Sequence, residues 1–340
     1  MTAQQARPGP GSVRESGLAF DDILSDDGTR LRVWTNDPHG LIDGPTVVLC
    51  NGLGTNAWCW PALLDPDCGV RVVSWHHRGI GGSERPKDPQ RVGIEEFVED
   101  GLSVMDHFNI DRAVLVGWSI GVNTAFELAA RHPERVLGIF AVAGVPGDTF
   151  ATMLGPFHLP HSVARAVTVN LSRAMKYGGW ALSPIARRLP VGERTVAVLG
   201  RTGFMMRIPD AELASTAIKE FLSTPIDWYF HLALKTSEHA RVRLSTINVP
   251  AFFVAGKYDV LAGARDMASA AERMVEATYV ELKASQWTAL RGAAERVMAL
   301  EAILAAWPGG LLVVSHDGEF LDAIGVSRRI DLSRSREGAS

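Results

Sequence analysis

The stretch "AVLVGWSIGVNTAFELAARHPERV", residues 113–136, decides the fold. It begins with a short apolar run, passes through the turn "GWSIG" (residues 117–121), and continues with a helical, amphipathic pattern. Glycine at both ends of the turn lets the chain bend sharply and lets strand and helix approach closely. Such a strand–turn–helix unit exposes the hydroxyl of Ser119 above a sheet and directs backbone N–H groups of the helix toward it. The GxSxG pattern alone is weak in a chain with 33 glycines, but its context makes it specific.

Other short apolar runs accompany this unit along the chain. They are nearly continuous in apolar residues, as is typical of strands buried on both faces of a parallel sheet. They occupy residues 46–50, 70–75, 113–117, 136–144, 249–256 and 277–282. A hairpin is predicted around the turn "SDDG" (25–28), and helical patterns follow at 93–108, 123–133 and 294–307. Alternating strands and helices predict an α/β fold with a doubly wound, mostly parallel sheet of eight strands.

Residues 146–245 interrupt this alternation. They contain no convincing buried strand, and their helical segments are rich in Met, Phe, Trp, Ala and Leu. About a hundred residues is too long for a loop in a compact domain. We therefore expect a helical cap at 146–245, inserted into a core made of residues 16–145 and 246–308. The remaining parts are predicted to be a disordered leader, an atypical C-terminal extension and a disordered tail, at 1–15, 309–332 and 333–340.

Composition excludes several classes of function. Lys and Arg total 34 and Asp and Glu total 38, so the net charge of −4 gives no electrostatic reason to expect nucleic acid or an anionic membrane as partner. No apolar run approaches the roughly eighteen residues that a membrane span needs. The chain also begins without the apolar segment of a secretory signal. We expect a cytoplasmic protein without metal or cofactor, and homo-oligomerisation is left open.

Four motifs in order resemble the α/β-hydrolase superfamily, in particular its capped serine hydrolases. Besides "GWSIG", Asn51-Gly52 stands at the place of the family's His-Gly oxyanion loop. The segment "SWHHRGIGGSERP" (74–86) resembles the family's Asp-x-Arg-Gly-x-Gly-x-Ser segment, with His76 at the Asp place. The segment "VAGKYDVLA" (254–262) resembles the acid loop. The resemblance covers roughly residues 16–308.

The resemblance implies a role for each matching residue. Ser119 would be the nucleophile, and the N–H groups of Leu53 and Ile120 would form the oxyanion hole. Asp259 would orient the catalytic base, with Asp148 as the alternative acid. The adjacent His76 and His77 end a strand at the same edge of the sheet and are expected to support the oxyanion loop.

The family's histidine base is missing from its expected position. The segment "KASQWTAL" (283–290) follows the last core strand, and its spacing from Asp259 places Gln286 where the histidine is expected. A glutamine amide cannot accept the proton of the serine hydroxyl. Without a base, serine is a poor nucleophile.

A second histidine comes into question at the C-terminal end. The segment "GGLLVVSHDGEFLDAIGVSRRIDL" (309–332) resembles the end of an ABC-type ATPase domain, but the chain has no GxxxxGK[ST] loop to hold nucleotide phosphates. If its strand pairs beyond the last core strand, His316 emerges at the catalytic edge. It would lie about four strands, or roughly 19 Å, from the strand before Ser119. His316 is therefore the candidate replacement base.

These observations predict a serine hydrolase that acts on an ester or related acyl bond of a small hydrophobic substrate through an acyl-enzyme on Ser119, with activity reduced by Gln286. The alternative is a catalytically inert, ligand-binding protein of the same fold. A perhydrolase or haloperoxidase would use the same triad and is not separated from the first interpretation. An epoxide or haloalkane hydrolase is disfavoured, because those relatives use Asp at the place of Ser119. A lipophilic substrate is favoured by apolar residues of the predicted cap: Phe204, Met205, Met206, Phe221, Trp228 and Phe230.

Overall fold

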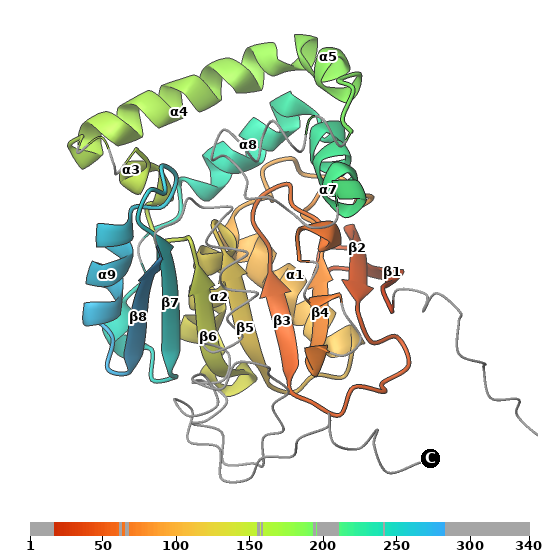
Figure 1. Cartoon of the computed structure of the whole chain (residues 1–340), viewed down its shortest axis with the longest axis vertical. Coiled ribbons are helices and arrows are strands. Elements are labelled where there is room, and N and C mark those ends of the chain that lie inside the picture. Colours follow the sequence, from red (N-terminus) through yellow and green to blue (C-terminus); the bar gives the residue numbers. More distant parts are fainter. Residues whose placement is uncertain are drawn as a thin grey trace, which may run out of the picture.

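An eight-stranded sheet forms the centre of the molecule (Figure 1). The computed structural model describes residues 17–282, with gaps at 61–62, 65–67, 155–156, 158, 193–194, 196–210 and 241. The strands are β1 (Ala19–Leu24), β2 (Arg30–Thr35), β3 (Thr46–Cys50), β4 (Arg71–Trp75), β5 (Ala113–Trp118), β6 (Val136–Val142), β7 (Ala251–Gly256) and β8 (Ala277–Leu282). Their order is β1-β2-β4-β3-β5-β6-β7-β8, with β1, β2 and β4 paired antiparallel and the rest parallel. The predicted α/β class with a mostly parallel, eight-stranded sheet is confirmed.

Three helices cover one face of the sheet, and α1 and α2 lie behind it in Figure 1. They are α1 (Ile94–His107), α2 (Gly121–Arg131) and α9 (Ala264–Glu272). Successive side chains of β5 alternate between the faces: Leu115 packs in the core cluster with these helices, whereas Val116 belongs to a second cluster on the opposite face. Both side chains are buried, so this strand is apolar on both faces, as its continuous apolar run predicted.

The sequence pattern predicted the elements of the core closely. The runs at 46–50 and 277–282 coincide with β3 and β8, and the patterns at 93–108 and 123–133 correspond to α1 and α2 with ends shifted by no more than two residues. The predicted hairpin is the β1–β2 pair. The pattern at 294–307 lies outside the described residues.

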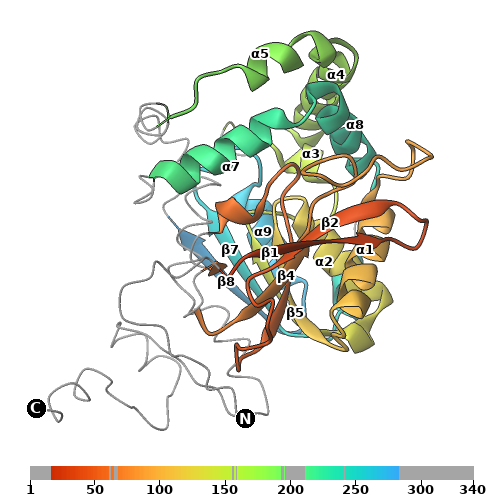
Figure 2. The ribbon, with the colours of Figure 1, turned by 90° about the vertical axis from the view of Figure 1, so that its right-hand side faces the viewer.

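A group of helices lies between β6 and β7 in the chain and over the edge where the parallel strands end (Figures 1 and 2). These inserted helices are α3 (Thr149–Thr152), α4 (His161–Gly178), α5 (Ser183–Arg187), α7 (Ala211–Ser223) and α8 (Ile226–Thr236). Hydrogen bonds connect them to the core. Among these, Trp228 Nε1 donates to Arg78 O at 2.9 Å, and Asn56 Nδ2 donates to Ala217 O at 3.1 Å. The guanidinium of Arg85 also lies 4.3 Å from the centroid of the Trp228 ring. None of the helices in the described part of the chain combines the length and apolar content that crossing a bilayer requires.

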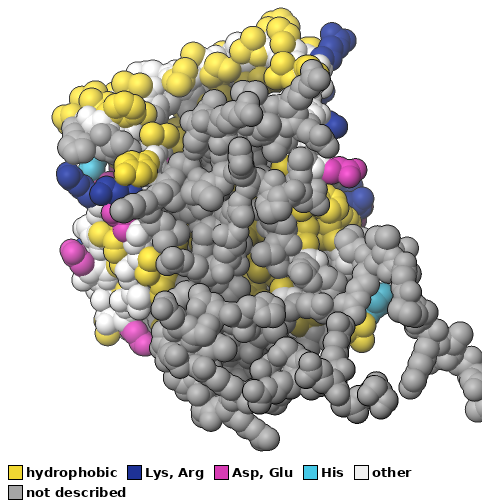
Figure 3. Space-filling view, in the orientation of Figure 1, with side chains coloured by type: hydrophobic (Ala, Val, Ile, Leu, Met, Phe, Trp, Pro, Cys, Tyr) yellow, Lys and Arg dark blue, Asp and Glu magenta, His cyan; other side chains and the backbone are white. Residues whose placement is uncertain are grey.

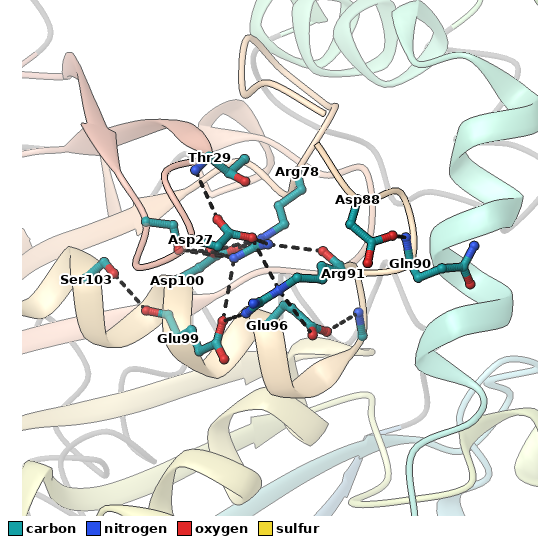
Figure 4. Close-up of polar contacts among 12 residues, drawn as sticks. Asp27, Thr29, Arg78, Asp88, Gln90, Arg91, Glu96, Glu99, Asp100 and Ser103 are labelled. Atoms are coloured by element: carbon teal, nitrogen blue, oxygen red, sulfur yellow. Dashed lines mark hydrogen bonds and ion pairs between the residues drawn. The ribbon is translucent and has the colours of Figure 1, made fainter. Parts of the chain in front are cut away.

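The loop after β4 is fixed by a buried network around Arg78, shown in Figure 4. The Arg78 cluster consists of Ser25, Asp27, Arg78, Arg91 and Asp100. Arg78 and Asp100 are fully buried and joined by three hydrogen bonds of 2.7–3.1 Å. Arg78 also donates to Asp27 Oδ2 at 2.5 Å, to Arg91 O at 3.1 Å and to Ser25 Oγ at 3.1 Å. This network joins the β1–β2 turn, the loop after β4 and helix α1.

Candidate active site

Ser119 occupies the sharp turn between β5 and α2. Its φ is +56°, in the left-handed region that non-glycine residues adopt rarely and at an energetic cost. The turn is held by two backbone hydrogen bonds: Ser119 N donates to Val142 O at 3.0 Å, and Val122 N donates to Ser119 O at 3.1 Å. A strained residue between a buried strand and a helix N-terminus is the geometry that the "GWSIG" pattern predicts for an exposed nucleophile.

Three glycines make this turn sterically feasible. A Cβ on Gly117 would lie 2.7 Å from Val122 Cα, and one on Gly121 would lie 1.9 Å from Cys50 O. A Cβ on Gly144 would lie 2.3 Å from Ser119 O. The sequence pattern identified the first two glycines but not Gly144. Its only signal was its position in the "AVAGVPG" segment after β6, which places it beside the serine once β5 and β6 are paired.

The loop after β3, residues 51–54, lies against the start of α2. A Cβ on Gly121 would also meet Asn51 O at 2.7 Å, so the backbone of the loop touches the turn. Thr55 fixes the loop through its N–H and Oγ1, which donate to Gly52 O at 3.1 and 2.6 Å. Neither Leu53 N–H nor Ile120 N–H donates to an acceptor among the described residues, although both residues are buried. Their role as oxyanion donors stays a prediction, with two neighbouring amides left available for it.

Asp259 is placed three residues after β7, at the same edge of the sheet. Its side chain is 1% exposed. Oδ1 accepts hydrogen bonds from Leu261 N at 2.7 Å and Ala262 N at 2.9 Å, whereas Oδ2 has no partner among the described residues. Burial raises the pKa of Asp259 to about 7, against the two hydrogen bonds that lower it. A buried carboxylate with one oxygen unused is arranged to accept one further donor.

The alternative acid, Asp148, has a different environment. It lies in the segment after β6, its side chain is 30% exposed, and Arg165 Nε donates to its Oδ1 at 3.1 Å. Because an exposed arginine already pairs with this carboxylate, Asp259 is the better candidate for orienting a base.

Both candidate positions for a base lie outside the described residues. Gln286, at the expected histidine position, and His316, the candidate replacement, both fall after residue 282. Of the described histidines at this edge, His76 stacks on Phe20 and His77 contacts Phe97 edge-on. Burial lowers the pKa of His76 to about 4 and that of His77 to about 3, so both are neutral at pH 7. Their expected support of the oxyanion loop stays a prediction.

An apolar cluster surrounds the candidate oxyanion hole. Leu53 and Ile120 pack with Phe150 of α3 and with Trp228 and Leu232 of α8. Aromatic residues of α7 and α8 also contact the loop after β3. A Cβ on Gly54 would lie 3.0–3.2 Å from the rings of Phe221 and Tyr229. Ile120, the residue after Ser119, therefore packs in an apolar cluster with the inserted helices. The predicted cap residues Phe204, Met205 and Met206 lie outside the described residues.

In the part of the chain described, no three His, Cys, Asp or Glu side chains are grouped to hold a metal ion.

Comparison with known proteins agrees with this geometry. Residues 45–174 match the family described as alpha/beta hydrolase fold. Epoxide hydrolase A of Mycobacterium tuberculosis is 26% identical over 280 residues, which are 72% of this chain and 83% of that protein. A 2-hydroxymuconate semialdehyde hydrolase of Pseudomonas is 39% identical over 99 residues, 28% of this chain and 35% of that protein. With several of the curated relatives the match thus spans only about two fifths of their length.

Solved structures extend the similarity to most of the fold. The enol-lactonase of Burkholderia xenovorans superimposes with a TM-score of 0.60 at 24% identity, covering 84% of this chain and 99% of that one. At this identity the match carries the fold alone. The chain thus has the α/β-hydrolase fold, and the sequence matches support its assignment to that superfamily.

Proposed function

We propose that this chain, which has the α/β-hydrolase fold, is a serine hydrolase that cleaves an ester or related acyl bond of a small hydrophobic substrate. The observation that carries the proposal is the φ of +56° at Ser119, held between three glycines that tolerate no side chain. Strain of this kind persists only where the surrounding structure enforces it, and it clusters at active sites. The similarity to several hydrolases supports hydrolysis as the general class of reaction.

The proposed reaction proceeds through an acyl-enzyme. Ser119 Oγ attacks the substrate carbonyl carbon and gives up its proton, and the new oxyanion accepts hydrogen bonds from the N–H groups of Leu53 and Ile120. The tetrahedral intermediate collapses, the C–O bond to the alcohol breaks, and the alcohol leaves with a proton. Water then attacks the acyl-serine and releases the acid. Both acylation and deacylation need a group that accepts a proton and gives it back, and Asp259 would orient that group.

The first relative, an epoxide hydrolase, suggests a second reaction class, which the chemistry of Ser119 disfavours. If a serine hydroxyl opened an epoxide, the product would be an alkyl ether on the protein. Water attacks an acyl ester readily but does not cleave such an ether under comparable conditions. A carboxylate nucleophile would form a hydrolysable ester, and this chain has Ser119 at the turn instead.

The second candidate function, an inert ligand-binding protein of the same fold, is favoured by Gln286. A general base contributes about 10²- to 10⁴-fold to such reactions. An assay with a chromogenic short-chain ester separates the alternatives, comparing the unmodified chain with Ser119→Ala, Gln286→His and His316→Ala. We expect a slow rate that Ser119→Ala abolishes, and Gln286→His to increase kcat by about 10²-fold or more.

The controls assign the base. Loss of activity in His316→Ala identifies His316 as the base of the unmodified chain. Activity in Gln286→His alone, abolished by adding Ser119→Ala, indicates that the unmodified chain is the inert alternative. If neither the unmodified chain nor Gln286→His hydrolyses any ester of a panel with different chain lengths, the hydrolase proposal fails.

A further inference from the structure

Helix α4 exposes several of its larger apolar side chains. Its buried residues are small, Ala164 and Ser172, whereas Val163, Val167 and Leu171 are 44%, 49% and 60% exposed. A surface helix of a globular protein normally places its apolar stripe against the core. Three large apolar side chains of α4 therefore remain exposed in the part of the chain that the structure describes.

The apolar surface continues past α4 into α5. Ten of the seventeen exposed large hydrophobic residues in the described part of the chain lie within residues 157–189. Figure 3 shows apolar side chains running along the top of the molecule, over α4. We call these residues the α4–α5 surface: Phe157, Leu159, Val163, Val167, Leu171, Tyr177, Trp180, Leu182, Ile185 and Leu189. Contiguous apolar patches of this kind mark interaction sites.

The charged residues within residues 149–192 are all of one sign. Residues 149–192 contain no Asp or Glu, although the whole chain has a net charge of −4. The same segment contains five cationic residues: Arg165, Arg173, Lys176, Arg187 and Arg188. The charge of this segment therefore differs in sign from the net charge of the whole chain.

Two of these cations are available for an anion. Arg173 and Lys176 line a cavity of about 270 Å³ between α4 and α8, and neither has a carboxylate partner among the described residues. Lys235 lies on the opposite wall and is paired with Glu238. His231 also lines the cavity; it is 6% exposed and its Nδ1 has no hydrogen-bond partner among the described residues.

We propose that the α4–α5 surface binds the surface of an anionic phospholipid bilayer. The apolar side chains would enter the boundary between headgroups and acyl chains, and Arg173 and Lys176 would contact lipid phosphates. Interfacial helices combine such an apolar face with Lys and Arg, whose long side chains reach the headgroup level. Tyr177 and Trp180, 76% and 68% exposed, are the residue types enriched at that level.

A second copy of the chain fits this surface less well. A symmetric dimer would bring the same patch of both copies together. The cations of one copy would then face those of the other, with no carboxylate from residues 149–192 to pair with them. Anionic lipid supplies the missing negative charge.

The α4–α5 surface lies close to the candidate active site. Val169 of α4 packs against the apolar cluster that contains Leu53 and Ile120 of the candidate site. Bilayer binding through the α4–α5 surface would therefore bring that site close to apolar molecules dissolved in the membrane. The binding itself goes beyond the proposed hydrolase function and does not depend on it.

Cosedimentation of the full chain with vesicles tests the proposal. We expect binding to vesicles that contain phosphatidylglycerol, weaker binding to phosphatidylcholine vesicles, and loss of binding at high salt. Arg173→Gln and Lys176→Gln should each lower the partition coefficient about fivefold, because a basic residue near an anionic surface contributes about 1 kcal/mol. Leu171→Ser and Trp180→Ser should lower it as well.

Leu41→Ser is the matched control, since Leu41 is 80% exposed between β2 and β3 and far from α4 in the chain. It should leave vesicle binding unchanged. The proposal is overturned by an unmodified chain that binds no vesicle, by equal binding to both lipid compositions, or by equal losses in Leu41→Ser and Leu171→Ser. Sedimentation velocity without lipid adds one outcome: a dimer that Leu171→Ser dissociates would assign the surface to a second copy. Because no arm measures hydrolysis, failure here leaves the ester assay unaffected.

Discussion

Two buried carboxylates in this molecule, Asp100 and Asp259, differ in how many of their oxygens have a hydrogen-bond partner. Asp100, in the Arg78 cluster, is fully buried and has both oxygens engaged, by Arg78 and by Ser25 Oγ at 2.6 Å. Asp259 is 1% exposed and has one oxygen engaged and one without a partner among the described residues. The hydrogen bonds of Asp100 join the loop after β4, the β1–β2 hairpin and helix α1, and they leave neither of its oxygens without a partner. Asp259 is at the edge of the candidate site and has an open position for a donor.

The difference separates a carboxylate in a saturated ion pair from a carboxylate that is a candidate for function. Burial by itself lowers the pKa of an arginine, but the hydrogen bonds and charge of Asp100, together with Asp27, more than compensate and raise the pKa of Arg78. Burial raises the pKa of both carboxylates; Arg78 opposes this for Asp100, whereas no cation among the described residues opposes it for Asp259, whose pKa is raised to about 7. A group held at such a pKa near an open edge is a candidate for catalytic work, whereas a saturated ion pair is not.

Breaking the saturated cluster should have the largest effect on stability. Arg78→Met leaves the fully buried Asp100 without its cation, and removal of one partner from a buried ion pair costs about 3–5 kcal/mol. Urea unfolding at neutral pH measures this change. Arg131→Met is the control, because Arg131 is 45% exposed in its pair with Glu127 and should cost under about 1 kcal/mol. Equal losses in the two variants would contradict the assigned role of the cluster.

The sequence predicted the fold more completely than it predicted this cluster. Strands such as β5 and β7 are apolar on both faces, so their continuous runs identified them without tertiary information. The "HHRG" segment drew attention to Arg78, but its partners Ser25 and Asp100 lie 53 and 22 residues away in the chain. Which polar residues meet in a buried network depends on how the β1–β2 turn and α1 are placed, and no local pattern contains that.

A pH series sharpens the comparison at Asp259. The folded-state pKa of about 7 lies above the ordinary value of 3.8, so the folded state retains a proton that the unfolded state releases. The stability that this proton contributes is complete below the unfolded pKa and is lost as the pH rises through about 7. Asp259→Asn does not titrate and should therefore become more stable relative to the unmodified chain between about pH 4 and pH 7. The gain is limited to about 1.4 kcal/mol for each pKa difference of one.

Free energies of unfolding measured across this pH range check the prediction, and Asp148→Asn, at a carboxylate that is 30% exposed, gives the background. A constant difference between Asp259→Asn and the unmodified chain would mean that Asp259 is ionised when folded. A cationic partner would then occupy its second oxygen, as a histidine from the residues after 282 would do.

The candidate site shows where sequence reasoning reached its limit. The spacing of "GWSIG" placed Ser119, Gly117 and Gly121 correctly in the β5–α2 turn, since a turn is a local structure. Gly144 was missed, because its need for glycine arises from the approach of Ser119 O across the β5–β6 pair. The sequence could not predict that one oxygen of Asp259 has no partner either, because the burial of a loop carboxylate depends on all the residues packed around it.

The smallest effect is expected where the Arg78 cluster meets the inserted helices. Trp228 Nε1 donates to Arg78 O, and a Cβ on Gly79 would lie 2.2 Å from that nitrogen, so indole and loop are in close contact. Trp228→Phe keeps an aromatic ring but leaves a buried carbonyl without its donor, which costs about 1–2 kcal/mol. Trp180→Phe, at a tryptophan that is 68% exposed, should change the free energy of unfolding little. Hydrogen exchange of Trp228→Phe shows which elements lose stability. Faster exchange confined to α8 would mean that the hydrogen bond stabilises only the inserted helices. Faster exchange in β4 and α1 as well would mean that α8 and the Arg78 cluster unfold as one unit. We expect the second result, because the acceptor of the indole is the backbone of the residue around which the whole cluster is built.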